Sequence, residues 1–299
     1  MNPKPKKDGR FKMRLLVRGD TKPDSWSVGP IDSPVASMDS IRTLVFSGEL
    51  SDEAETIATI DVKNAFRQSV NFSPDEEPRY VAYKAHKQAD LRVFKLLGSL
   101  YGSKDAAMQW FNTLSPFLQS IGFQQGQNDK ALFYNPKTKV RIAGWVDDLV
   151  VRGPKRHIKA VFQQLSQRFQ LKPPQYLDEE SEIYFVGMRL RQMYKQGVKW
   201  YSIDQERDIL AFLDDAGVHA ARGVSAPMPN KNLISADTTP LSSQKQSQYR
   251  FMIGSLQYFV CGTQWHLAHC VARLGQFNSA ATKGAKKQLQ WNGVFKILT

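Results

Sequence analysis

The sequence predicts an α+β protein in which helices pack against a mostly antiparallel sheet. Three observations support this class: short β-branched runs, amphipathic stretches with apolar residues every three or four positions, and tight turns between neighbouring runs. The chain has 299 residues, enough for a hydrophobic core and two or three subdomains. Its hydrophobic fraction of 41% is typical of a globular protein.

The first third of the chain is expected to supply three strands and one helix. Alternating residues predict a strand at 11–18, and β-branched or aromatic runs predict strands at 56–62 and 79–83. Apolar residues at helical spacing, followed by a glycine, predict a helix at 38–48. A polar loop is expected at 71–79.

The middle of the chain has the clearest helical pattern. At 104–121, apolar residues recur at spacings of three and four until Gly122 ends the helix. A hairpin with strands at 131–134 and 139–145 follows, and then a second amphipathic helix at 155–169. The Pro173-Pro174 pair breaks the chain there.

The last part of the chain is expected to begin with a strand pair and to continue as helices. The strands are predicted at 183–190 and 199–203. Residues from 209 onward are mainly helical, with a link rich in Pro, Ser and Thr at 225–243. Cys261 and Cys270 are interpreted as buried thiols, since neither a disulfide framework nor a zinc site has enough ligands.

Charge favours a nucleic-acid partner, with simple solubility as the alternative. The chain has 41 Lys and Arg against 28 Asp and Glu, a net charge of +13. Residues 1–18 hold seven basic residues and one acid, and residues 238–299 hold seven basic residues and no acid. No run of about 18 apolar residues and no signal-peptide segment occurs, so a soluble, intracellular protein without a membrane partner is expected.

An acidic pair, Asp147-Asp148, lies between two apolar, β-leaning runs. Carboxylates at the tip of a hairpin suit hard divalent cations such as Mg²⁺, although a solvated turn is the common reading of such a pair. Asp61 ends the strand at 56–62 and could face the pair across a sheet, or it could be an ordinary strand-end residue. Three carboxylates so placed would suit in-line displacement at phosphorus. A Ser-His-Asp arrangement, a phosphate-binding GxxxxGK[ST] loop and a CxxC pair are all absent from the sequence.

Several strings along the chain resemble the reverse transcriptase domain of copia-type LTR retrotransposons. They occur in the family's order and at close to its spacing. The strings are FKMRLLVRG (11–19), PVASMDSIRTLV (34–45), IDVKNAF (60–66), LYGSKDAAMQWF (100–111), GF…D…LFY (122–134), WVDDLVV (145–151), YFVGMRL (184–190) and YRFMIGSLQYFV (249–260).

The resemblance implies a right-hand polymerase. Partial fingers would occupy 1–50, a palm with a fingers insertion and a primer-grip-like hairpin 51–203, and a thumb or connection 204–299, without ribonuclease H, integrase or protease domains. The implied activity is RNA-directed DNA polymerisation, the transfer of a nucleotide from dNTP to a primer 3′-hydroxyl on an RNA or DNA template. The implied metal ligands are Asp61, Asp147 and Asp148, holding two Mg²⁺ ions for which Mn²⁺ could substitute. Other segments of a polyprotein are possible partners, and a virus-like particle in the cytoplasm or the nucleus is the implied location.

Two further sets of residues correspond to the family's binding sites. The dNTP set comprises Lys12, Arg14, Lys63, Asn64, Ala65, Phe66, Tyr101 and Gly102. The primer and template set comprises Trp145, Phe185, Gly187, Met188, Lys283, Lys286 and Lys287. The ring of Phe66 would select against a ribose 2′-hydroxyl, and the basic fingers residues would hold the triphosphate. The alternatives are a core phenylalanine, an exposed basic strand and a solvated helix face.

The chain departs from the family at two places. Trp145 stands where the family usually has Tyr, and Thr263-Gln264-Trp265-His266 stands where a Thr-Arg-Pro-Asp string is usual. The chain also lacks upstream fingers sequence, so a partial polyprotein, a processed fragment or a degenerate copy is expected. A catalytically inactive nucleic-acid-binding remnant is therefore the main alternative, and a metal-dependent nuclease is a third.

Overall fold

The computed structural model describes residues 4–5, 11–12, 16–17, 32–84, 88–179, 181–216 and 237–291. Contacts divide the chain into two compact units, Met1–Leu177 and Asp178–Thr299. Each unit is described separately below. None of the helices in the described segments has the length and apolar character needed to span a membrane.

The first unit is built on a six-stranded sheet in which every neighbouring pair is antiparallel. This arrangement confirms the predicted antiparallel sheet and the hairpin that leads into the acidic pair. Across the sheet the strands are β10 (Gln175–Tyr176), β3 (Glu55–Asp61), β9 (Asp148–Pro154), β8 (Arg141–Trp145), β7 (Leu132–Tyr134) and β6 (Gln124–Gln125).

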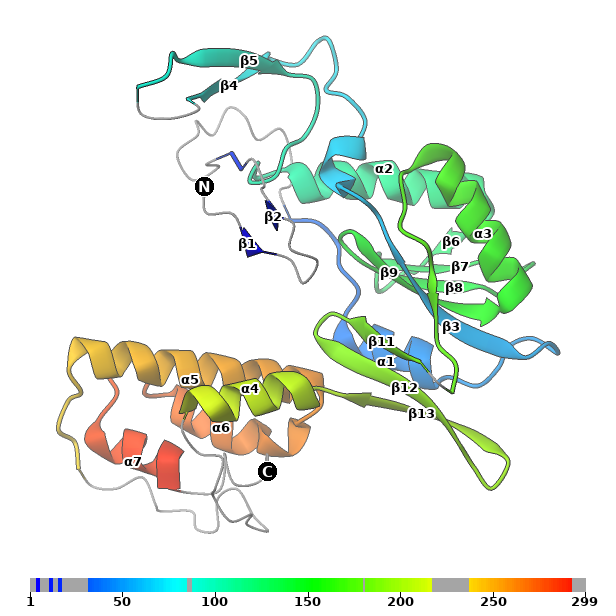
Figure 1. The fold of residues 1–299 in the computed structure, drawn as a ribbon. Coiled ribbons are helices and arrows are strands. Elements are labelled where there is room, and N and C mark those ends of the chain that lie inside the picture. The colour runs from blue at the N-terminus through cyan, green and yellow to red at the C-terminus, as the bar shows by residue number, and fades with distance from the viewer. Residues whose placement is uncertain are drawn as a thin grey trace. The chain divides into compact units, whose positions relative to one another are not determined.

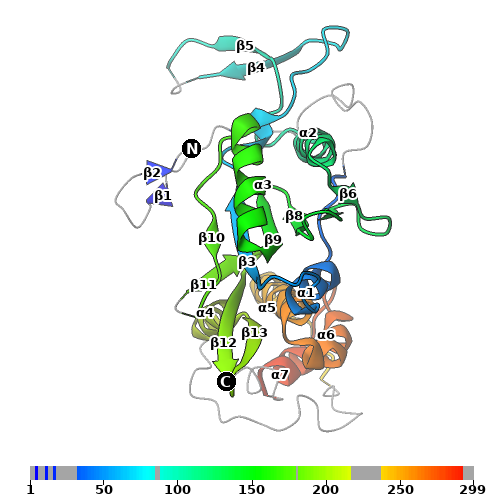
Figure 2. The ribbon, with the colours of Figure 1, turned by 90° about the vertical axis from the view of Figure 1, so that its right-hand side faces the viewer.

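Three helices cover this sheet, and all three were predicted from apolar spacing. In Figure 1, α2 (Ala106–Ser120) and α3 (Lys155–Arg168) lie on one side of the sheet and α1 (Met38–Phe46) lies on the other. The core on the α2/α3 side contains Trp110 and alternate residues of the central strands, such as Ala58 and Ile60 of β3. Figure 2 shows α3 running along the strands beneath it.

Strand alternation decides on which side each site residue lies. Successive side chains of a strand point to opposite faces. Since Ala58 and Ile60 face the α2/α3 core, Asp61 points to the other face. By the same argument Leu149 and Val151 face the core, and Asp148 points away from it. The two acids therefore share the face of the sheet that carries α1.

The remaining elements of the first unit are short. They are β1 (Lys4–Pro5), β2 (Phe11–Lys12), the 3₁₀ helix η3 (Ala65–Gln68), β4 (Arg79–Tyr83) and β5 (Arg92–Leu96). The strand predicted at 11–18 is described only as β2, and Leu16 and Val17 are not in a strand.

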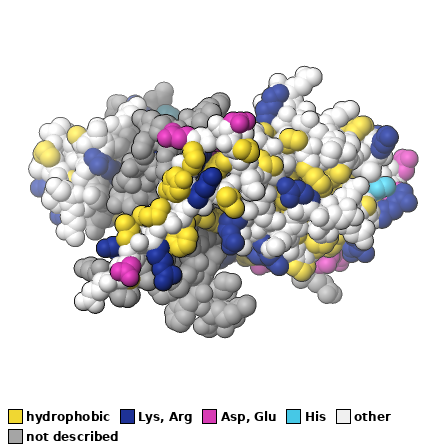
Figure 3. Space-filling model, turned by 90° about the horizontal axis from the view of Figure 1, so that it is seen from above, with side chains coloured by type: hydrophobic (Ala, Val, Ile, Leu, Met, Phe, Trp, Pro, Cys, Tyr) yellow, Lys and Arg dark blue, Asp and Glu magenta, His cyan; other side chains and the backbone are white. Residues whose placement is uncertain are grey.

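The β4–β5 hairpin exposes large apolar side chains, including Tyr80, Val93 and Phe94. The hairpin is uppermost in Figure 1, and the view from above in Figure 3 shows hydrophobic side chains interspersed with Lys and Arg. Arg79 fixes the base of the hairpin, because its guanidinium donates to Asp105 at 2.6 Å and lies 4.0 Å from the centre of the Phe72 ring.

The second unit joins a three-stranded antiparallel sheet to a helical bundle. Its elements are β11 (Glu182–Phe185), β12 (Met188–Lys195), β13 (Val198–Asp204), α4 (Glu206–Ala216), α5 (Ser243–Gly262), η4 (Trp265–Leu267), α6 (Ala268–Gly275) and α7 (Lys283–Trp291). The mainly helical C-terminal region was predicted, and most of the link at 225–243 lies outside the described residues.

Two predictions for this unit are wrong. A turn at Val186-Gly187 divides the strand expected at 183–190, because both residues have positive φ, +50° and +73°, as a two-residue hairpin turn requires. Cys261 is exposed, whereas Cys270 is buried as predicted. The buried positions of α5 include Leu256 and Phe259, so Cys261 falls on the opposite, solvent-facing side of the helix.

Candidate nucleotidyl-transfer site

The strand register brings the three predicted acids to one place. Asp61, the last residue of β3, is the direct cross-strand partner of Asp148, the first residue of β9. Asp147 lies in the two-residue turn between β8 and β9, next to the paired residues Trp145 and Asp148. The amide of Val62 donates to the carbonyl of Asp147 at 2.9 Å, which ties this turn to the end of β3.

The turn itself holds a residue in an unfavourable backbone conformation. Val146 has φ +56°, a region that β-branched residues rarely adopt. Such a conformation costs about 1–3 kcal/mol and persists only where the surroundings enforce it. Here the indole N–H of Trp110 donates to the carbonyl of Val146 at 2.7 Å, and the Val146 side chain packs against the core. Trp110 therefore contributes to the position of Asp147 as well as to the core.

Negative charge is concentrated at this end of the sheet. Burial, together with the charges of Asp147 and Asp61, raises the pKa of Asp148 to about 6, although the charge of Lys172 acts in the opposite direction. Lys172 also forms an ion pair with the carboxylate of Asp61, and its amide donates to the Asp61 carbonyl at 2.9 Å. A cationic side chain thus stands beside the acids.

The donor set suits a hard divalent cation, but the side chains are not arranged as a metal site. Carboxylate and backbone carbonyl oxygens are the ligands that Mg²⁺ prefers. Among the residues that the structure describes, no group of three or more His, Cys, Asp or Glu side chains is placed to hold a metal ion. The ammonium of Lys172 provides the positive charge next to Asp61 in this arrangement. The residue types therefore fit Mg²⁺, and Asp61 would have to exchange Lys172 for the ion.

Five residues of the predicted dNTP set lie close to the end of β3. Four of them, residues 63–66, follow β3 in the sequence, and the fifth, Tyr101, contacts Phe66. The rings of Phe66 and Tyr101 are in contact, with centroids 4.9 Å apart. Asn64 adopts a left-handed conformation with φ +51°, which starts the 3₁₀ turn, and Ala65 is buried. Lys63 is exposed, and its amide donates to the carbonyl of Gln170 at 2.9 Å.

Gly102 extends this group toward the N-terminal segment. The amide of Val17 donates to the carbonyl of Tyr101 at 2.8 Å. Gly102 has φ +88°, and a Cβ there would lie 2.0 Å from the Val17 carbonyl oxygen. Only glycine fits this close approach. Of the two basic fingers residues, Arg14 lies outside the described residues, and Lys12 is described only as part of the backbone of β2.

The predicted primer residues have different exposures. Trp145 is partly exposed at the end of β8. Phe185 and Met188 are buried and are paired across the β11–β12 turn, so their side chains are not exposed to solvent. Gly187 lies in that turn against Tyr258, whose hydroxyl oxygen would be 1.7 Å from a Cβ at this position. Lys283, Lys286 and Lys287 lie on α7 in the same unit.

Sequence reasoning missed Lys172 and the second role of Trp110. Lys172 lies 111 residues from Asp61 and carries no motif. Trp110 lies within the helix expected at 104–121 and is buried, but its hydrogen bond to Val146 depends on the tertiary fold. The N–H of a buried Trp usually has a hydrogen-bond partner, which was the one available signal.

Comparisons with known proteins define the class of this chain. Residues 2–230 match the family described as reverse transcriptase (RNA-dependent DNA polymerase). The chain therefore belongs to the reverse transcriptase family, as the sequence motifs predicted.

The curated relatives are polyproteins of copia-type transposons. The chain is 30% identical over 281 residues to the retrovirus-related Pol polyprotein from transposon RE1 of Arabidopsis thaliana, a match that covers 92% of this chain and 18% of the polyprotein. It is 27% identical over 305 residues to the Pol polyprotein from transposon TNT 1-94 of Nicotiana tabacum, covering 96% and 22%. The chain thus spans about a fifth of the length of these relatives and corresponds to their reverse transcriptase segment.

One solved structure, telomerase from Candida albicans in complex with a fragment of telomeric RNA, matches with a TM-score of 0.34 and 12% identity. The match covers 93% of this chain and 53% of that chain.

Proposed function

We propose that this chain is the polymerase domain of a copia-type element and that it extends a primer on an RNA or DNA template. Asp61, Asp147 and Asp148 would bind two Mg²⁺ ions, which Mn²⁺ could replace. When bound, the ions would activate the primer hydroxyl and stabilise the leaving pyrophosphate. The proposed architecture is a right-hand polymerase with a partial fingers region (1–50), a palm (51–203) and a thumb or connection (204–299).

The observation that supports this proposal most strongly is the cross-strand pairing of Asp61 with Asp148. Two adjacent strands hold carboxylates with like charges close together, although this arrangement is unfavourable without a cation. The raised pKa of Asp148, about 6, is a consequence of burial and of the neighbouring acids. Perturbed acids of this kind are enriched at functional sites.

The chain's own residues would position and select the nucleotide. Phe66 would lie beneath the sugar of the incoming dNTP, and its contact with Tyr101 supports the ring from the side. A fixed ring at that place would clash with a 2′-hydroxyl. The amides of Asn64 and Ala65 are the proposed donors to the triphosphate, because the Lys63 amide already donates to Gln170. Lys12 and Arg14 would hold the triphosphate from the fingers side.

The primary experiment is primer extension with purified protein and Mg²⁺. Asp147→Asn should reduce incorporation by roughly a hundredfold or more, since metal-assisted stabilisation amounts to several kcal/mol. Asp52→Asn is the matched control, because Asp52 is an exposed acid on the same unit. Equal incorporation by wild type and Asp147→Asn would refute the mechanism.

Nucleotide selection is tested separately. Phe66→Ala should raise incorporation of rNTP relative to dNTP, and Tyr101→Ala should do so more weakly by removing the contact that holds the ring. An unchanged ratio in Phe66→Ala would show that Phe66 acts only in packing.

A second candidate is a nucleic-acid-binding domain without catalytic activity. The ion pair between Lys172 and Asp61 favours it, because an ammonium group neutralises one of the three acids. The Trp145 substitution beside the acidic pair also favours it. This candidate predicts steeply salt-dependent binding of a primer–template with no incorporation. Any extension that Asp147→Asn abolishes would eliminate it.

A further inference from the structure

A pocket lined by four lysines lies in the helical part of the second unit. Its volume is about 440 Å³. We call it the α5–α7 lysine pocket, since its lining comes from the start of α5, from α7 and from the residues just before α5. The lining residues are Pro240, Leu241, Ser242, Lys245, Lys283, Lys286 and Lys287.

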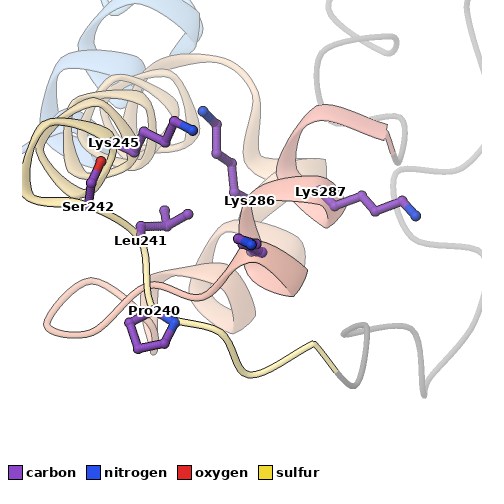
Figure 4. A pocket seen from close by; sticks show the side chains of 7 residues that line it. Pro240, Leu241, Ser242, Lys245, Lys286 and Lys287 are labelled. Carbon is purple, nitrogen blue, oxygen red and sulfur yellow. The ribbon is translucent and has the colours of Figure 1, made fainter.

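Two of these lysines converge from different helices. Figure 4 shows the side chains of Lys245, on the first turn of α5, and Lys286, on α7, extending toward each other, whereas Lys287 points away. Neither Lys245 nor Lys286 forms an ion pair with a described carboxylate. Two ammonium groups facing each other repel, and a bound anion would convert that repulsion into attraction.

Acidic side chains are scarce near the pocket. Asp237 is the last acid of the sequence, and residues 238–299 contain none. Its pKa is lowered by hydrogen bonds from Thr239, and then by the charges of Lys283 and Lys287. The negative charge of Asp237 therefore offsets the charges of Lys283 and Lys287. Residues 238–291 contain no acidic side chain that could offset the charge of Lys245.

The start of α5 adds to the positive potential. Ser242 is the N-cap residue, yet its side chain makes no capping hydrogen bond. Its hydroxyl lines the pocket beside Lys245 (Figure 4). The first amides of a helix carry partial positive charge and favour an anion.

We propose that the α5–α7 lysine pocket binds one phosphodiester of a nucleic-acid backbone, with Lys245 and Lys286 on the phosphate and Ser242 donating to one of its oxygens. Leu241 and Pro240 form an apolar wall against which the adjoining sugar packs. The pocket is at the lower end of the size range of ligand sites, ~300–1,000 Å³, which leaves room for a sugar as well as a phosphate. The choice of a nucleic acid over a free phosphate rests on the proposed function.

The test measures how duplex binding depends on salt. Fluorescence anisotropy of a labelled primer–template is followed from about 50 to 200 mM salt for wild type and for Lys245→Gln/Lys286→Gln. Each neutralised phosphate contributes ~0.9 to the slope of log K against log salt. The double variant should therefore lose about 0.9 of slope, and at about 0.1 M salt its affinity should fall about eightfold.

A matched variant separates the pocket from total charge. Lys159→Gln/Lys195→Gln removes the same two charges from exposed lysines of α3 and β12, and it should leave the slope unchanged. Lys245→Arg/Lys286→Arg keeps the charge and should retain binding, which excludes a folding defect as the cause. Equal slopes for wild type and the pocket variant, or equal losses in both glutamine variants, would overturn the proposal.

Two further readouts distinguish other outcomes. If calorimetry shows that inorganic phosphate binds wild type but not the pocket variant, and the duplex slope does not change, the ligand is a free phosphate and the phosphodiester assignment is wrong. Primer extension is scored independently with Asp147→Asn. A loss of salt slope in the pocket variant without Asp147-dependent extension would support this inference and reject the polymerase proposal. Asp147-dependent extension without a loss of salt slope would support the polymerase proposal and reject this inference.

Discussion

Glu55 is the side chain whose neutralisation should destabilise the first unit most clearly. It is fully buried at the start of β3, and one of its oxygens accepts from Arg141 and, at 3.0 Å, from Arg152. Its other oxygen accepts from the Leu50 amide at 3.0 Å. Arg152 in turn donates to the carbonyl of Val45, in the last turn of α1, at 2.6 Å. One carboxylate thus balances two guanidiniums and connects α1 to the sheet.

The variant Glu55→Gln keeps the shape and a hydrogen-bond acceptor but removes the charge. Both buried guanidiniums would lose the carboxylate charge that they share, and burial already lowers the pKa of Arg141. Breaking a buried ion pair by removing one partner costs about 3–5 kcal/mol. In a unit of this size each 1 kcal/mol lowers Tm by about 2–4 °C, so Tm should fall by ~6–20 °C.

Urea and thermal unfolding of the purified chain measure this change. The control is Glu53→Gln, which removes an exposed carboxylate paired with an exposed Arg156 and should cost less than about 1 kcal/mol. If Glu55→Gln and Glu53→Gln unfold within about 1 kcal/mol of each other, the buried network does not stabilise the unit as described.

Three other predictions concern single contacts. Lys172→Ala should lower the Mg²⁺ concentration for half-maximal extension by at most about fivefold, because the exposed ion pair between Lys172 and Asp61 contributes about 0.2–1 kcal/mol. An unchanged Mg²⁺ titration would contradict competition between Lys172 and Mg²⁺ for Asp61. Gly187→Ala should destabilise the second unit by about 1–3 kcal/mol, because its Cβ would overlap the Tyr258 hydroxyl, and Gly187→Ala/Tyr258→Phe should recover part of the loss in thermal unfolding. Burial raises the pKa of Tyr249 from 10.0 to about 12, so its neutral form favours folding and this contribution is lost as pH rises from 10 through about 12. Tyr249→Phe should lack that loss in melting curves recorded across this pH range, and a parallel decline in both proteins would assign it to other groups.

Much of the secondary structure could be predicted from the sequence, since it depends on local patterns. The helices α2 and α3 follow from apolar residues at spacings of three and four. The division of 183–190 was missed because Val186, which has positive φ in the structure, is a poor turn residue.

The candidate site was predicted only in part. The acids and Phe66 could be proposed from the sequence because they belong to short strings with residues of fixed type and order. Lys172 and Lys245 belong to no such string. Their positions depend on how segments far apart in the chain come together, and periodicity carries no information about that.

The sequence by itself therefore determined the class of this protein, its antiparallel sheet and the identity of its three acids. Only the tertiary structure decided that Asp61 pairs with Asp148, that Trp110 holds the strained turn at Val146, and that Glu55 balances two buried arginines. The physical reason is that motifs and amphipathic periods are local properties of the chain. Strand register, buried charge compensation and the convergence of lysines are set by contacts between residues distant in sequence.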